Sequence, residues 1–164
     1  MDALALLRDQ AAAADSLMTQ VAADITAEQA SWHLDGSTAN PIGATLLHIS
    51  AVEDRAVQRF QGQPPLLEAA GWGERLGYGP GAPWSPETRP DPDACRAYAA
   101  EVRAATARYL AGLDPAELAR EVDSSRGRRS LANLLTLVLV LHKLTHTGEI
   151  AALLGCQGVR GFPF

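Results

Sequence analysis

The chain has 164 residues, of which 47% are hydrophobic and 5% aromatic, and its formal net charge is −5. This length suits one domain, residues 1–164, with a core of its own, and the acidic balance argues against nucleic-acid binding. The two cysteines, Cys95 and Cys156, share no close spacing, which argues against a disulfide framework and favours a reducing cytoplasm.

No membrane partner is expected from the sequence. The first residues, 1–5, lack the basic region that begins a signal peptide. The longest apolar run, residues 134–141, is too short to span a bilayer. Since aromatic residues are few, the core must consist of Ala, Leu and Val. Ala and Leu are strong helix formers, so an all-α protein is favoured.

The first helix is predicted over about residues 2–24. Its apolar residues recur at spacings of three and four, which indicates one buried stripe: Leu4, Leu7, Ala11, Ala14, Met18, Val21 and Ile25. A polar linker, residues 26–39, follows. We interpret His33 in this linker as a surface or packing residue rather than a ligand.

The second helix is predicted to begin at Asn40 and Pro41, as cap and first helical residue, and to end before Gly62. His48 lies on a face of small residues with room for an imidazole and whatever it binds. Residues 62–92 are rich in Pro and Gly and too long for an ordinary connection. They form either a lid or pocket wall, or a plain surface excursion.

The third helix is predicted over residues 93–113, capped by Asp91 or Asp93. A short helix after Asp114 and a turn or small hairpin over residues 121–129 lead to Ser130, which caps the fourth helix. Three arginines of the hairpin, at 126, 128 and 129, form either a solvated loop or an anion clamp at a pocket edge.

The fourth helix begins at Leu131 and carries histidines on an apolar face. His142 and His146 lie four residues apart, so they project from one face, in line with Leu135 and Val138. The helix is also apolar on its other sides, which indicates a central position or contact with a second subunit. Four long helices with long connections predict a four-helix bundle with long crossover connections.

Three histidines on apolar helix faces need partners, because burying unpaired polar groups is costly. Either hydroxyls such as those of Thr45 and Thr145 satisfy them, or His48, His142 and His146 bind a divalent metal. Three protein ligands with an open position are typical of catalytic zinc, and no cysteine is placed as a fourth ligand for structural zinc. We favour the metal.

Glu149 lies three residues beyond His146, on the same face. It is our candidate catalytic residue, as a base, as a partner orienting an imidazole or as a fourth ligand; a salt bridge to a facing arginine is the structural alternative. The metalloprotease motif His-Glu-x-x-His is absent, because Lys143 stands at the glutamate position.

Two stretches resemble the DinB-like superfamily, which includes the maleylpyruvate isomerase-like bundles. They are Asn40 to Ile49, which contains His48, and Ser130 to Ile150, which contains the other two histidines; residues 153–161 are similar to the family's short tail. The resemblance implies a four-helix bundle, often dimeric, whose divalent metal is held by His48, His142 and His146. It also implies zinc or nickel as the metal.

Characterised members of that family include enzymes that use mycothiol, bacillithiol or related thiols. The resemblance therefore implies a cytoplasmic homodimer that transfers sulfur to, or isomerises, small electrophiles, with the thiol bound to the metal. A metal-activated hydrolase with Glu149 as base is one alternative. A non-enzymatic dimeric metal-binding stress protein is the other.

Overall fold

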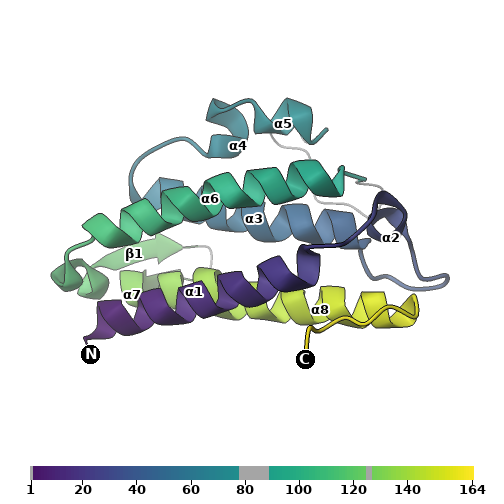
Figure 1. Cartoon of the computed structure of the whole chain (residues 1–164). Helices are drawn as coiled ribbons and strands as arrows, with labels where there is room; N and C mark the ends of the chain where they lie inside the picture. The colour runs from purple at the N-terminus through teal and green to yellow at the C-terminus, as the bar shows by residue number, and fades with distance from the viewer. Residues whose placement is uncertain (1, 78–88, 125–126) are drawn as a thin grey trace.

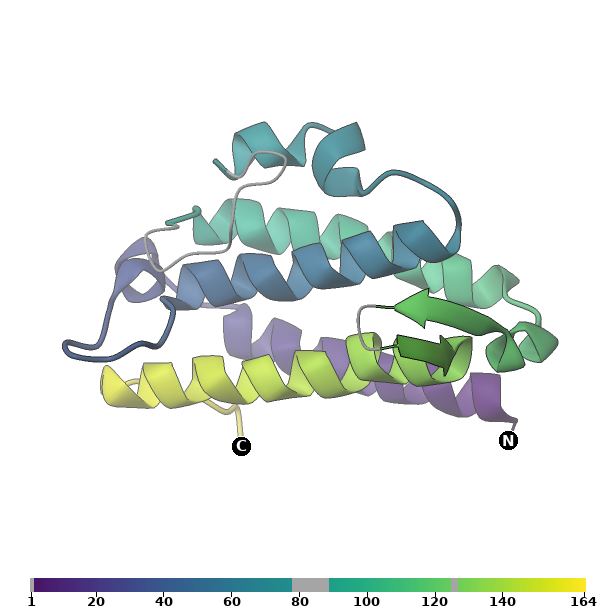
Figure 2. The ribbon, with the colours of Figure 1, turned by 180° about the vertical axis from the view of Figure 1, so that it is seen from behind.

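The computed structural model describes residues 2–77, 89–124 and 127–164. Four long helices form a bundle of two layers (Figure 1). One layer holds α3 (Ile42–Phe60) and α6 (Pro92–Gly112), and the other holds α1 (Ala3–Ala22) and the last helix (Leu131–Cys156). The predicted all-α class is confirmed; the only sheet among the described residues is one short hairpin. Seen from behind, this hairpin lies at the end of α3, beside the start of the last helix (Figure 2).

Helix α1 (Ala3–Ala22) forms as its pattern predicts. The Asp2 side chain accepts a hydrogen bond from the Ala5 amide, which caps the first turn. All seven residues of the predicted stripe, from Leu4 to Ile25, are buried. The linker after it also contains α2 (Ala27–Ser31), which the sequence analysis missed, although Thr26 and Gln29 form a capping box at its start.

Helix α3 (Ile42–Phe60) begins slightly later than predicted. Pro41 occupies the cap position and Asn40 makes no cap, so that part of the prediction was wrong. Proline fixes an extended backbone before the first helical residue, which is sufficient to start the helix here. The helix ends before Gly62, whose φ of +68° is a left-handed conformation that suits glycine.

The Pro/Gly-rich segment is partly helical. It contains α4 (Leu66–Ala69) and α5 (Trp72–Arg75), and the buried Trp72 donates its indole N–H to Glu101 of α6 at 2.7 Å. The carboxylate of Asp54 accepts hydrogen bonds from the main-chain amides of Leu66 and Leu67, and these bonds hold the segment against α3. These residues cover the outer side of α3 and α6 (Figure 1). The remainder of the predicted lid, residues 78–88, lies outside the described residues.

Helix α6 (Pro92–Gly112) is capped by Asp91, one of the two predicted caps. After it come the 3-10 helix η1 (Pro115–Ala119) and the antiparallel strands β1 (Glu121–Ser124) and β2 (Gly127–Ser130). The predicted hairpin is therefore confirmed. Ser130 caps the last helix through the Asn133 amide, also as predicted.

The last helix is continuous over Leu131–Cys156 but changes its winding in the middle. It consists of α7 (Leu131–Thr136), a π-helical segment η2 (Leu137–His142) and α8 (Lys143–Cys156). By length and composition it could cross a membrane, but core helices pass the same test, and this one packs against α1 and α3. Cys156 is exposed at its end.

The π turn changes which residues of the last helix face the core. Five buried residues follow one another at strict spacings of four: Leu131, Leu135, Leu139, Lys143 and Thr147. In a regular α-helix of 3.6 residues per turn, the last would lie about 160° around the axis from the first. The wider π turn reduces this drift. The histidine face therefore lies at the edge of the core, not along the leucine seam that the sequence predicted.

This register can be tested with two leucines of the π segment and the same substitution. Leu139 is fully buried, so Leu139→Ala should lower the free energy of unfolding by about 2–5 kcal/mol through a cavity. Leu141 is 55% exposed within one chain, so Leu141→Ala should change the free energy of unfolding of a single chain by less than about 0.5 kcal/mol. Denaturant unfolding measures both; equal losses would contradict the π register.

Candidate metal centre

The structure brings together the three histidines that the sequence singled out. His48 comes from the middle of α3, His142 ends η2, and His146 lies one turn later in α8. One ring nitrogen of each lies within 4.8 Å of the other two, and the Nε2 atoms of His48 and His142 are 3.1 Å apart. All three side chains are half-buried. They could hold one metal ion.

The local electrostatics keep His48 neutral. Burial, reinforced by the neighbouring His146, lowers the pKa of His48 to about 4, even though Glu149 acts in the opposite direction. A neutral imidazole has a lone pair on one ring nitrogen, which is the form that binds metals.

The spacing of the imidazoles suits a tetrahedral ion. Two nitrogens bound to zinc at about 2.0–2.1 Å with tetrahedral angles lie about 3.3 Å from each other. The 3.1 Å between His48 and His142 is close to this value. Because the site supplies three imidazoles and is half-buried, a bound ion would keep a position for an exogenous ligand.

Glu149 contacts the site through His146. Its Oε2 atom lies 2.7 Å from Nδ1 of that histidine, and its side chain is 32% exposed. A carboxylate that accepts the Nδ1 proton fixes the tautomer and leaves Nε2 for a metal. Of the roles considered for Glu149, orienting His146 is the one that this contact supports.

The hydroxyl alternative for the histidines receives no support. Thr45 and Thr145 donate instead to main-chain carbonyls of their own helices, those of Pro41 at 3.3 Å and Leu141 at 2.8 Å. His33 lies outside the group, as expected, and neither Cys95 nor Cys156 joins it.

Residues 10–150 match the family model described as the DinB superfamily. The chain belongs to the DinB superfamily. Its fold is also similar to the crystal structure of a conserved protein of Enterococcus faecalis, with a TM-score of 0.77. That likeness covers 93% of this chain and 95% of the other at 15% identity, and so concerns the fold alone. No curated protein sequence matches the chain.

The structure also reveals a charged cluster that the sequence analysis overlooked. Lys143 is 2% exposed, and its ammonium is paired with Glu53 of α3 at 2.7 Å and with Asp15 of α1. Glu53 in turn accepts a hydrogen bond from Thr106 of α6 at 2.7 Å. The cluster therefore joins all four helices of this DinB bundle at the residue that follows His142.

Lysine is so seldom buried that sequence reasoning places it on the surface. One signal could have revealed the cluster. Lys143 continues the buried row of leucines at a spacing of four.

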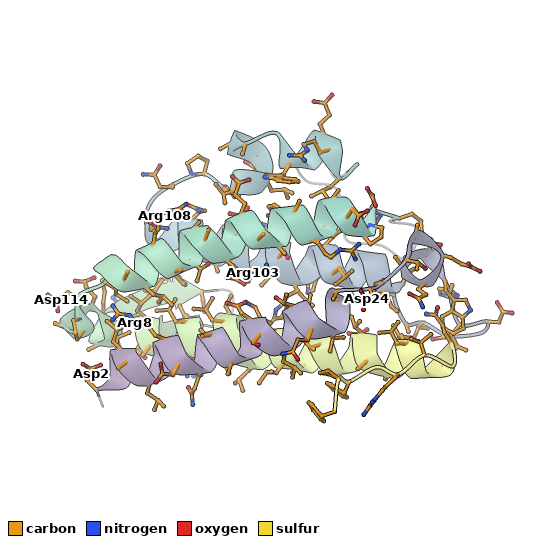
Figure 3. All side chains as sticks on the ribbon, in the orientation of Figure 1. Asp2, Arg8, Asp24, Arg103, Arg108 and Asp114 are labelled. Carbon is orange, nitrogen blue, oxygen red and sulfur yellow. The ribbon has the colours of Figure 1, made fainter. Side chains whose placement is uncertain are left out.

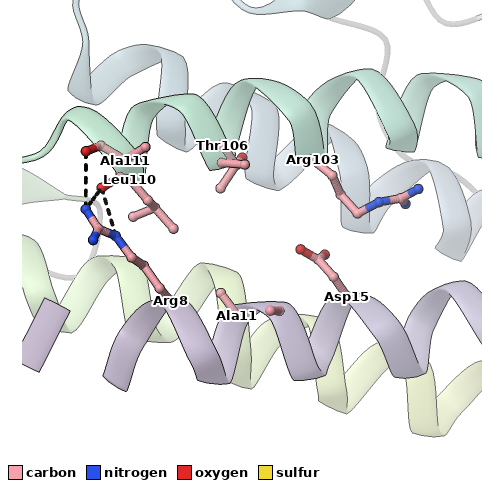
Figure 4. A pocket seen from close by; sticks show the side chains of 9 residues that line it. Arg8, Ala11, Asp15, Arg103, Thr106, Leu110 and Ala111 are labelled. Carbon is pink, nitrogen blue, oxygen red and sulfur yellow. Dashed lines mark hydrogen bonds between the residues drawn. The ribbon is translucent and has the colours of Figure 1, made fainter. Parts of the chain in front are cut away.

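Another cavity lies away from the histidines. It measures about 370 Å³ and lies between α1 and α6, where alanines of both helices leave space. Figure 3 shows Arg8 and Arg103 on this side of the DinB bundle. In the closer view, Arg8 is hydrogen-bonded to the carbonyls of Leu110 and Ala111, and Asp15 points toward α6 (Figure 4). We assign this cavity no part in the metal centre.

The buried cluster generates a stability prediction. Lys143→Met should lower the free energy of unfolding by about 3–5 kcal/mol, because it leaves the carboxylate of Glu53 buried without its cation. The double variant Lys143→Met/Glu53→Gln should recover most of this loss. The glutamine side chain is neutral, and its amide oxygen can still accept the hydrogen bond from Thr106. Chemical denaturation provides the measurement.

An exposed ion pair serves as the control. Glu117→Gln removes the pairing with Arg120, whose side chain is 42% exposed, and should cost less than about 1 kcal/mol. A loss below about 1 kcal/mol for Lys143→Met would show that the ammonium is not held as described.

Proposed function

We propose that this DinB protein is a divalent-metal-dependent enzyme that uses a low-molecular-weight thiol to transfer sulfur to, or isomerise, a small electrophile. The observation that carries the proposal is the convergence of His48, His142 and His146 from two helices. Zinc or nickel suits three imidazoles, and mycothiol or bacillithiol are the thiols that other family members use. We expect the enzyme in the cytoplasm.

A metal held there would bind the thiol sulfur and lower its pKa, so that thiolate is present at neutral pH. The chain's own residues supply the rest. The three imidazoles fix the ion at the edge of the core. Glu149 holds His146 in the orientation and tautomer that metal binding requires.

Space for the second substrate supports an enzymatic rather than a structural role. A groove of about 230 Å³, lined by residues of α3 and of the last helix, ends at His142. It opens beside the hairpin, on a different side of the bundle from the α1–α6 cavity. The described part of the Pro/Gly-rich segment, one of the candidate pocket walls, contributes no residue to this groove.

The metal and the thiol can be tested in one series. The purified protein should contain or take up about one zinc or nickel ion per chain, measured by elemental analysis, and His142→Ala and His48→Ala should abolish this binding. In the cobalt-substituted protein, adding mycothiol or bacillithiol should produce a near-ultraviolet thiolate-to-cobalt absorption band.

His33→Ala is the matched control, because it removes a histidine outside the triad and should leave metal binding unchanged. Protein that takes up no zinc or nickel would refute the proposal and leave a non-enzymatic binding protein. Metal binding without a thiolate band would refute the proposal that a thiol binds the metal and would favour the metal-activated hydrolase.

We further propose that the protein is a homodimer that pairs through its last helix. Leu141 is 55% exposed and Leu144 39%, and both lie on the outer face of the helix that carries two of the histidines. Together they form a small apolar patch, and pairing with the same patch of a second copy would cover both leucines.

Leu141→Glu should convert the dimer to a monomer that still folds, because the side chain is exposed within a single chain. Analytical ultracentrifugation measures the mass. Leu6→Glu, at a 43% exposed leucine of α1, is the control and should remain dimeric. A monomeric wild-type protein would refute this proposal.

A further inference from the structure

The groove that ends at His142 has apolar walls on both sides. It is lined by Val52, Ala56 and Phe60 of α3 and by Leu134, Leu137 and Val138 of the last helix. Most of these side chains are half-buried, so they offer a surface that a ligand can cover. A cavity of about 150 Å³ is enough for benzene. The groove, at about 230 Å³, has room for a ring-sized body and a short substituent.

The far end of the groove carries a positive charge. Arg59 of α3 lines it and donates from Nη2 to the main-chain carbonyl of Asp123 at 3.2 Å. Within the described ranges no carboxylate pairs with this guanidinium. A guanidinium offers five N–H donors in a planar fork that fits a carboxylate, so most of its donors remain available.

The nearby Asp123 side chain does not cancel this charge. It also lines the groove, but it is 88% exposed and lies 3.9 Å from Arg128 of β2. Arg55, one turn before Arg59 on α3, adds a second positive charge whose influence reaches His48. In a chain of net charge −5, the region is therefore locally positive, and anions are the favoured ligands.

We propose that this groove selects as second substrate a small acid with an apolar, ring-sized body, whose carboxylate binds Arg59. The body lies between α3 and the last helix, and the opposite end of the molecule reaches His142. This inference rests on the proposed function for the chemistry at the histidines, but the binding it describes does not require a metal.

A pair of unreactive probes of one shape tests the charge. The acid 3-phenylpropionate should bind the protein at least about tenfold more tightly than the neutral 3-phenylpropanamide, by titration calorimetry or NMR. Arg59→Gln should remove this preference, because it should weaken the binding of the acid and leave the binding of the amide unchanged. Arg55→Gln, on the same helix but outside the groove lining, should change the affinity for the acid by less than about threefold.

A second variant tests the apolar walls. Ala56→Trp should fill the groove and abolish the binding of both probes while the protein keeps its melting temperature. Equal affinities of acid and amide for the wild type would overturn the proposal. So would a preference that survives Arg59→Gln in the zinc-loaded protein, since the carboxylate would then bind the metal.

The metal-free His48→Ala variant separates failure of this inference from failure of the proposed function. An Arg59-dependent preference for the acid in that variant supports the groove whether or not the wild type binds metal. A wild type that takes up no metal refutes the proposed function alone. No preference for the acid in either form of the protein refutes the groove alone.

Discussion

The bundle is organised around one buried cation. Lys143 lies in the middle of the last helix, where its ammonium contacts carboxylates of α1 and α3, and Glu53 extends the contact to α6. Buried charges are tolerated only when they are paired with good geometry. The four helices must therefore bring these residues to the same height in the bundle, and each helix must be rotated so that its residue faces the cluster. This constraint fixes the direction in which the neighbouring His142 points.

The π-helical segment just before Lys143 makes this arrangement possible. Without it, a row of residues spaced by four would leave the core, and the ammonium would turn away from its carboxylates. The segment ends at the first histidine of the pair. Wide turns of this kind are less favourable than regular helix and are frequent at functional sites. Here the wide turn lets one helix present leucines and a lysine to the core and histidines to its edge.

The placement of the histidines at the edge of the core bears on function. A triad at the centre would be closed off by leucines, whereas a half-buried triad can admit a ligand from outside. The fold itself does not specify the reaction, because the likeness to the Enterococcus faecalis protein at 15% identity concerns architecture alone. What distinguishes this chain is local: the groove that ends at His142, the arginine at its far end and the carboxylate behind His146.

The sequence by itself determined the four long helices, the hairpin and the three candidate ligands. Periodicity, caps and turns act between residues close in the chain, so the stripe of α1, the cap at Ser130 and the turn at Gly62 were predictable. His48, His142 and His146 were also predictable, because polar side chains on apolar helix faces need a partner.

Only the tertiary structure decided the rotation of the last helix, the buried Lys143 and the groove beside His142. Each depends on side chains far apart in sequence, such as Asp15 and Lys143, or Phe60 and Leu137. The prediction of a buried helix face also assumes 3.6 residues per turn, and the local sequence does not indicate where a helix departs from this value. The burial of a charge is decided by the partners that folding brings to it.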